Sequence, residues 1–133
     1  MRLFLVFALI FTIAFGAVEI FAAQDAERHE VKINKRKKFP RSKLTVKFLS
    51  VVEDSRCPEG ANCIWAGNAK IKVEISDGKA TEVFEMNTNL GPKGATFDGY
   101  DVNLVELSPA PTSESKTNPN SYTAVFEIVR LTR

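Results

Sequence analysis

Strict alternation of apolar and polar residues is the feature that most constrains the fold of this chain. In AKIKVEI, residues 69–75, apolar side chains alternate with Lys70, Lys72 and Glu74. A period of two is typical of a β-strand with one face buried and the other in water. Alternating segments also occur at residues 31–33, 44–52, 81–86, 100–107 and 122–131. No sustained helical period occurs after residue 23, so we expect an all-β fold.

The turns between these segments indicate antiparallel pairing. Asp77-Gly78 separates two alternating segments, and this dipeptide favours a β-hairpin because both turn positions need positive φ. About six to seven strands predict an antiparallel β-sandwich, with a small closed β-barrel as the alternative. We expect one face of residues 44–52 to be buried, through Leu44, Val46, Phe48 and Val52.

Three long connections separate the strands, at residues 53–68, 87–99 and 108–121. Leu90 and Phe97 are the apolar residues expected to hold the second connection against the body. The third is rich in proline, which predicts a mobile surface loop. A strand, a long loop and a strand occur in both halves of the chain, which hints at pseudo-symmetry.

The N-terminus carries the pattern of an export signal. Residues 3–18 are apolar and uncharged, and Arg2 precedes them. We expect cleavage after Ala22, which makes residues 1–22 the signal peptide and residues 23–133 a single β domain. Cleavage after Ala23 or retention as an anchor are the alternatives, although the segment is shorter than the ~20 residues that span a bilayer. No cysteine lies nearby to carry a lipid, so we expect a secreted or periplasmic protein without stable membrane insertion after signal removal.

Length, charge and cysteine count narrow the class of protein further. A chain of 133 residues has room for one core. A net charge of +2 does not indicate a nucleic-acid partner. Two cysteines in an exported chain predict one disulfide, between Cys57 and Cys63.

Both cysteines and the single tryptophan lie in DSRCPEGANCIWAGNA, residues 54–69. We favour Trp65 as a packing plug that covers the disulfide, and the alternative is a binding anchor on an exposed loop. Asp54 and Arg56 flank the loop and are expected to form an exposed ion pair of little energetic value.

These residues resemble a family of small exported bacterial proteins that share S-R-C-P followed by C-x-W-x-G. The matching positions are Ser55, Arg56, Cys57, Pro58, Cys63, Trp65 and Gly67. The resemblance covers most of the chain after the signal, and it implies an exported β-domain with a disulfide-closed loop but no particular activity. The chain departs from the family at KRKKFPRSK, residues 35–43, where relatives have a plain turn.

That basic segment has six basic residues in nine. We favour a solvated turn or an edge strand whose charges block edge-to-edge pairing. The alternative is attraction to an anionic surface, with an aromatic ring as apolar contact. The candidate residues are Lys35, Arg36, Lys37, Lys38, Phe39 and Arg41.

Few residues are suited to catalysis. His29 is the single histidine and precedes the first strand, and Asp98 and Asp101 are expected to be turn formers. We therefore expect no enzyme, no metal and no cofactor.

The function predicted is an exported, non-catalytic binding or interaction module, with Trp65 and Arg56 as candidate contacts. Its partner would be an unknown protein or an anionic surface ligand, and not a specific nucleic acid. One alternative is a protease inhibitor that uses the Cys57–Cys63 loop. Another is a structural domain that binds anionic surfaces through residues 35–43. The oligomeric state is left open.

Overall fold

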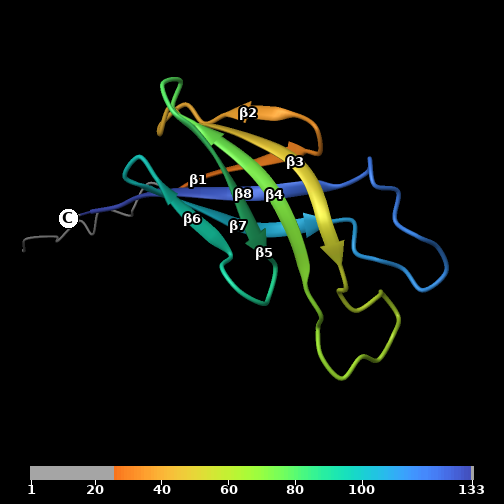
Figure 1. Ribbon diagram of the computed structural model, residues 1–133. Coiled ribbons are helices and arrows are strands. Elements are labelled where there is room, and N and C mark those ends of the chain that lie inside the picture. Colours follow the sequence, from red (N-terminus) through yellow and green to blue (C-terminus); the bar gives the residue numbers. More distant parts are fainter. Residues whose placement is uncertain (1–25, 133) are drawn as a thin grey trace, which may run out of the picture.

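The computed structural model describes residues 26–132, and within them the chain forms strands and connecting loops (Figure 1). The expected signal peptide and its cleavage site lie outside the described residues. The strands are β1 (Glu27–Lys32), β2 (Arg36–Lys38), β3 (Thr45–Asp54), β4 (Ala69–Ser76), β5 (Thr81–Asn87), β6 (Gly94–Phe97), β7 (Tyr100–Ser108) and β8 (Thr123–Arg130). No helix long and apolar enough to cross a bilayer occurs between residues 26 and 132.

The strands form two antiparallel sheets with the orders β1-β8-β7-β6 and β2-β3-β4-β5. The chain crosses between the sheets only twice, from β1 to β2 and from β5 to β6, and every other step is to a hydrogen-bonded neighbour. The two sheets do not close into a barrel, so the predicted sandwich is confirmed and the barrel alternative is wrong.

The described residues contain eight strands rather than six or seven. One addition is β2, whose three residues RKK pair with the start of β3 and are all exposed. The other is β6, which lies inside the connection 87–99 and pairs with β7. Both are short and lack an alternating apolar face, which is why the sequence pattern does not reveal them.

Apolar side chains from both sheets form one core. In β4 the alternation is complete, since Ala69, Ile71, Val73 and Ile75 are all buried. The T-shaped contact between Phe48 of β3 and Phe126 of β8 joins the sheets, with ring centroids 6.5 Å apart. Leu44, Val46 and Phe48 are buried as expected.

Val52 does not share that buried face. The pairing of β3 with β4 shifts between Phe48 and Ser50, and again between Val51 and Glu53. Each shift inserts an extra residue and changes which side chains face the core. Val51 therefore packs against the core and Val52 is exposed, which corrects the expectation for this position.

The repeated pattern of strand, long loop and strand has a structural counterpart. The pairs β3–β4 and β7–β8 each occupy the two central positions of a sheet. Their long loops lie at the same end of the sandwich and touch, since Glu59 donates its backbone N–H to the carbonyl oxygen of Pro111 at 2.9 Å. This end carries the residues of the S-R-C-P and C-x-W-x-G pattern.

Candidate functional site

The loop between β3 and β4 begins as a continuation of the ladder between these strands. Ser55 donates its backbone N–H to Asn68, and Cys57 donates its own to Ala66. The Cys57–Cys63 disulfide then closes the outer part, as predicted. The loop is thus a narrow projection held along its base (Figure 1).

Gly67 is required at the base of this projection. Its φ is +71°, a backbone conformation that side chains disfavour. A Cβ atom at this position would also collide with the backbone carbonyl of Ser55. The glycine of the C-x-W-x-G pattern therefore permits the close approach of the two sides of the loop.

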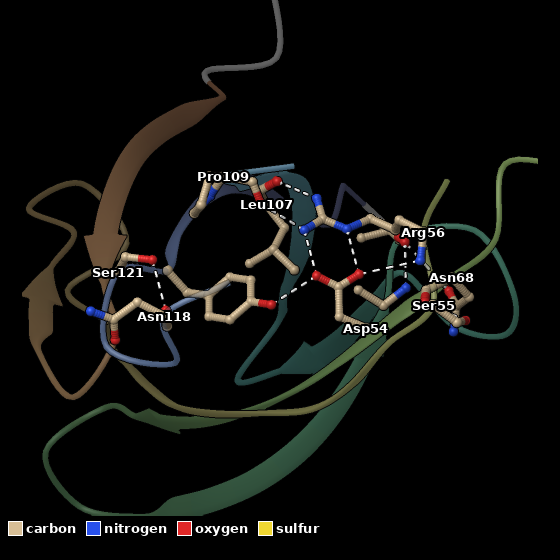
Figure 2. A network of polar contacts seen from close by, with 11 residues as sticks. Asp54, Ser55, Arg56, Asn68, Leu107, Pro109, Asn118 and Ser121 are labelled. Carbon is tan, nitrogen blue, oxygen red and sulfur yellow. Dashed lines mark hydrogen bonds and ion pairs between the residues drawn. The ribbon is translucent and has the colours of Figure 1, made fainter. Parts of the chain in front are cut away.

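Arg56 holds this loop to the loop that follows β7. Its guanidinium donates from Nε and Nη2 to the two carboxylate oxygens of Asp54, at 2.8 and 2.7 Å. It also donates to the backbone carbonyls of Leu107 and Pro109, at 2.5 and 2.8 Å. Figure 2 shows the guanidinium between the carboxylate and these carbonyls. The Arg56 and Asp54 side chains are only 13% and 9% exposed, so the predicted pair exists but is not an exposed one.

Tyr122 completes this polar network, because its hydroxyl donates to Oδ2 of Asp54 at 2.9 Å. Burial acts to raise the pKa of Asp54, but the hydrogen bonds from Arg56 and Tyr122 outweigh it and hold the pKa below its usual value. Asp54 is therefore ionised at neutral pH and stabilises the folded state above pH 4.

This linkage predicts a pH dependence. A carboxyl whose pKa is lower in the folded than in the unfolded state contributes stability above its unfolded pKa of about 4, and loses it as the pH falls further. The difference in unfolding free energy between wild type and Asp54→Asn should shrink between pH 6 and pH 3, as measured by urea denaturation. Asp77→Asn is a positive control, since turn N–H groups lower the pKa of Asp77 on the exposed surface and the same linkage predicts that its difference also shrinks on acidification. A difference that is constant with pH would contradict this linkage.

Asn68 connects the loop to a second loop, after β5. Its amide nitrogen donates to Oδ1 of Asn87 at 2.9 Å. Its amide oxygen accepts the backbone N–H groups of Asn89 and Leu90, each at 3.0 Å, and the hydroxyl of Thr88 at 3.4 Å. The Asn68 residue is buried. One side chain thus fixes the position of residues 87–90, which the sequence did not reveal.

Trp65 is not a packing plug. Its side chain is 82% exposed, and Ile64 before it and Leu90 on the second loop are also exposed. An apolar groove of about 410 Å³ lies between Trp65 and Leu90. The expectation that Leu90 holds its connection against the body is wrong, whereas Phe97 is buried as expected. Leu90 is free to face the groove because Asn68, and not Leu90, holds this loop.

The candidate basic residues do not join this site. Residues 35–38 lie on and next to β2, which pairs with the start of β3, whereas the projection follows its end. Figure 1 shows β2 and the projection at opposite sides of the molecule. The seven residue steps from Lys47 to Asp54 in β3 correspond to roughly 23 Å of extended strand.

Phe39 cannot serve as an apolar contact for a ligand, because it is completely buried and packs edge-on against His29 with ring centroids 4.9 Å apart. The side chains of Lys35, Arg36, Lys37 and Lys38 are exposed, and Arg41 is held near Glu27, whose carboxylate accepts its backbone N–H at 3.1 Å. Residues 36–38 form the edge strand of their sheet, as the edge-strand interpretation predicts.

Other polar residues form structural contacts. His29 lies 3.1 Å from the Glu27 carboxylate, and Asp101 accepts a hydrogen bond from Thr96 across the β6–β7 hairpin. Asp98 has a φ of +47°, as a turn residue does. Within residues 26–132, no three His, Cys, Asp or Glu side chains gather closely enough to hold a metal ion.

No protein-family model matches the chain, and neither a curated protein nor a solved structure is significantly similar to it. The resemblance carried by the S-R-C-P and C-x-W-x-G residues stays a prediction. The disulfide is compatible with an oxidising, exported location.

Proposed function

We propose that this protein is an exported, non-catalytic binding module that contacts its partner with the projection between β3 and β4. The observation that carries the proposal is the exposure of Trp65 on a loop that is otherwise tightly held. A tryptophan in water is an unfavourable arrangement that a partner would relieve, and tryptophan is enriched where binding energy concentrates.

The contacts below Trp65 support this role. Three separate contacts restrict the mobility of the loop: the disulfide, the Arg56 network and the hydrogen bonds of Asn68. A loop that is ordered before binding loses less conformational entropy when it binds. Arg56 contributes by positioning the loop, because its donors are already engaged by Asp54 and the carbonyls of the neighbouring loop.

The inhibitor alternative has less support. Protease-binding loops present an extended segment to the cleft, whereas the Cys57–Cys63 loop contains a tight turn in which Ala61 donates to the carbonyl of Pro58 at 3.1 Å. Binding of anionic surfaces through residues 35–43 lacks the apolar contact expected from Phe39, which is buried. The exposed lysines and arginine of β2 suit an edge strand that resists pairing.

Replacing Trp65 tests the proposed function. We expect Trp65→Ala to abolish retention of partners from the envelope and culture-medium fractions of the producing cells. Its melting temperature should change by less than about 3 °C, because truncating an exposed side chain costs little stability. Val83→Ala, which shortens an exposed apolar side chain on β5, is the matched control and should retain the same partners. Equal retention by wild type and Trp65→Ala would contradict the proposal.

A further inference from the structure

The large apolar side chains that are most exposed in the described chain gather at one end. Ile64, Trp65 and Leu90 are 102%, 82% and 67% exposed, and we name them the apolar tip. The other exposed large hydrophobics, on the strands and at the C-terminal end, reach at most 53%. The apolar tip belongs to two different loops, and Asn68 binds these loops together.

The groove within the apolar tip has few polar groups left for a ligand. Ser55 donates its hydroxyl to the carbonyl of Asn68 at 2.9 Å, and Asn89 donates its amide to the carbonyl of Gly67 at 2.6 Å. The amide of Asn68 is engaged on both its nitrogen and its oxygen. A sugar or a polar peptide needs donors that are not engaged within the protein. The groove therefore suits an apolar ligand.

Few charged side chains lie on the two loops that carry the apolar tip. Residues 57–67 and 88–92 contain a single ionisable side chain that can titrate, that of Glu59. The exposed cations of β2 lie at the far end of β3. A neighbouring hollow that Leu90 also lines contains Glu53, Lys70 and Glu85, whose charges differ in sign. Attraction to anionic head groups would need a cluster of basic residues beside the apolar side chains.

The small size of the apolar tip favours a lipid surface over a second protein as its partner. A stable protein–protein interface covers about 800 Å² on each partner, whereas three exposed side chains provide a few hundred Å². Such a small protruding group is sufficient for shallow insertion at a bilayer surface, where tryptophan prefers the head-group level.

We infer that the apolar tip docks reversibly on the surface of a lipid bilayer, with Ile64, Trp65 and Leu90 inserted among neutral lipids. The inference rests on the proposed function, since it names the partner of the same projection. The sandwich remains in water, and the charged residues of β4 and β5 beside Leu90 limit the depth of insertion.

Trp65 itself reports on this docking, because it is the only tryptophan. Residues 23–133 contain both complete sheets, so they are tested without the apolar residues 1–22. With phosphatidylcholine vesicles we expect cosedimentation and a blue shift of tryptophan emission, equal at 0.1 M and 0.5 M salt within about twofold, since charge makes no contribution. Leu90→Asp and Ile64→Asp should each weaken partitioning at least about tenfold, while Val83→Asp on β5 should not.

The outcomes distinguish the possible partners of the apolar tip. Absence of partitioning into phosphatidylcholine vesicles overturns the inference. Partitioning that requires anionic lipid and disappears at 0.5 M salt also overturns it and points to residues 35–38. A dimer in sedimentation analysis that Leu90→Asp dissociates, without vesicle binding, would identify a second copy as the occupant. If Trp65-dependent partner retention persists without vesicle binding, only this inference fails, and if both are absent the proposed function fails too.

Discussion

The Arg56→Met variant should lose roughly 3 kcal/mol of unfolding free energy at pH 7, since removing one partner of a buried ion pair leaves the other charge uncompensated. The variant keeps most of the side-chain volume but none of the donors. Asp54 then retains only the Tyr122 hydroxyl and the backbone N–H of Arg56 as hydrogen-bond donors. The carbonyls of Leu107 and Pro109 also lose their side-chain donor. A decrease of roughly 10–20 °C in melting temperature should accompany this loss.

Arg28→Met is the matched control for Arg56→Met. Arg28 pairs with Glu127 at 2.7 Å, but the two side chains are 56% and 27% exposed. Exposed pairs contribute less than about 1 kcal/mol. The double variant Asp54→Asn/Arg56→Met should be more stable than Arg56→Met alone, because no buried carboxylate is left unpaired. Equal losses in Arg56→Met and Arg28→Met, measured by urea denaturation, would show that the Arg56 network is not a stabilising element.

The fold was largely predictable because burial on one face of a strand leaves a direct trace in the sequence. The alternation of residues 69–75 identified β4, and Asp77-Gly78 identified its hairpin with β5, although only Gly78 has the positive φ expected of both turn positions. The register shifts in β3 leave no such trace, so Val52 was assigned to the wrong face. A shift depends on how two paired strands match in length and twist, which neither strand encodes alone.

Arg56, Trp65 and the two cysteines of the candidate site were predictable from the sequence, but Asn68, Leu90 and Tyr122 were not. The spacing of Cys57 and Cys63 indicated the disulfide, yet the position of Trp65 depends on where the loop points after it leaves the sheet. The carbonyl partners of Arg56 lie about fifty residues away in sequence, at the end of β7 and just after it, where the path of the chain is set by the pairing of β7 with β8. Long-range contacts of this kind follow from topology.

Asn68 was missed because an asparagine before a strand is ordinarily a turn residue. Its importance comes from the approach of the 87–92 turn, which Asn87 closes by donating its backbone N–H to the carbonyl of Pro92 at 2.8 Å. The two asparagine amides then meet at 2.9 Å. A pair of asparagines nineteen residues apart, each at the end of a strand of the Asp77-Gly78 hairpin, is the signal that could have revealed this contact.

The Asn68→Ala variant should lose roughly 3 kcal/mol of unfolding free energy, since each buried polar group left without a partner costs about 1–3 kcal/mol. The groups affected are the amide oxygen of Asn87 and the backbone N–H groups of Asn89 and Leu90. Water can reach part of this loop once the side chain is removed and can replace some of the lost hydrogen bonds. The loss of stability is therefore smaller than the sum of the costs of the three unpaired groups.

Asn89→Ala provides the comparison that decides whether Asn68 organises the site. Asn89 is exposed and its amide makes one hydrogen bond, to Gly67, so we expect a loss of less than about 1 kcal/mol. Hydrogen exchange should show faster exchange of the Asn89 and Leu90 amides in Asn68→Ala, because these N–H groups lose their acceptor. The loop that carries Leu90 is then held less rigidly beside Trp65. Binding of the protein to its partner should weaken, although the Trp65 and Leu90 side chains are both still present. If Asn68→Ala and Asn89→Ala lose equal stability and bind equally well, the two loops are held together by something other than the Asn68 side chain.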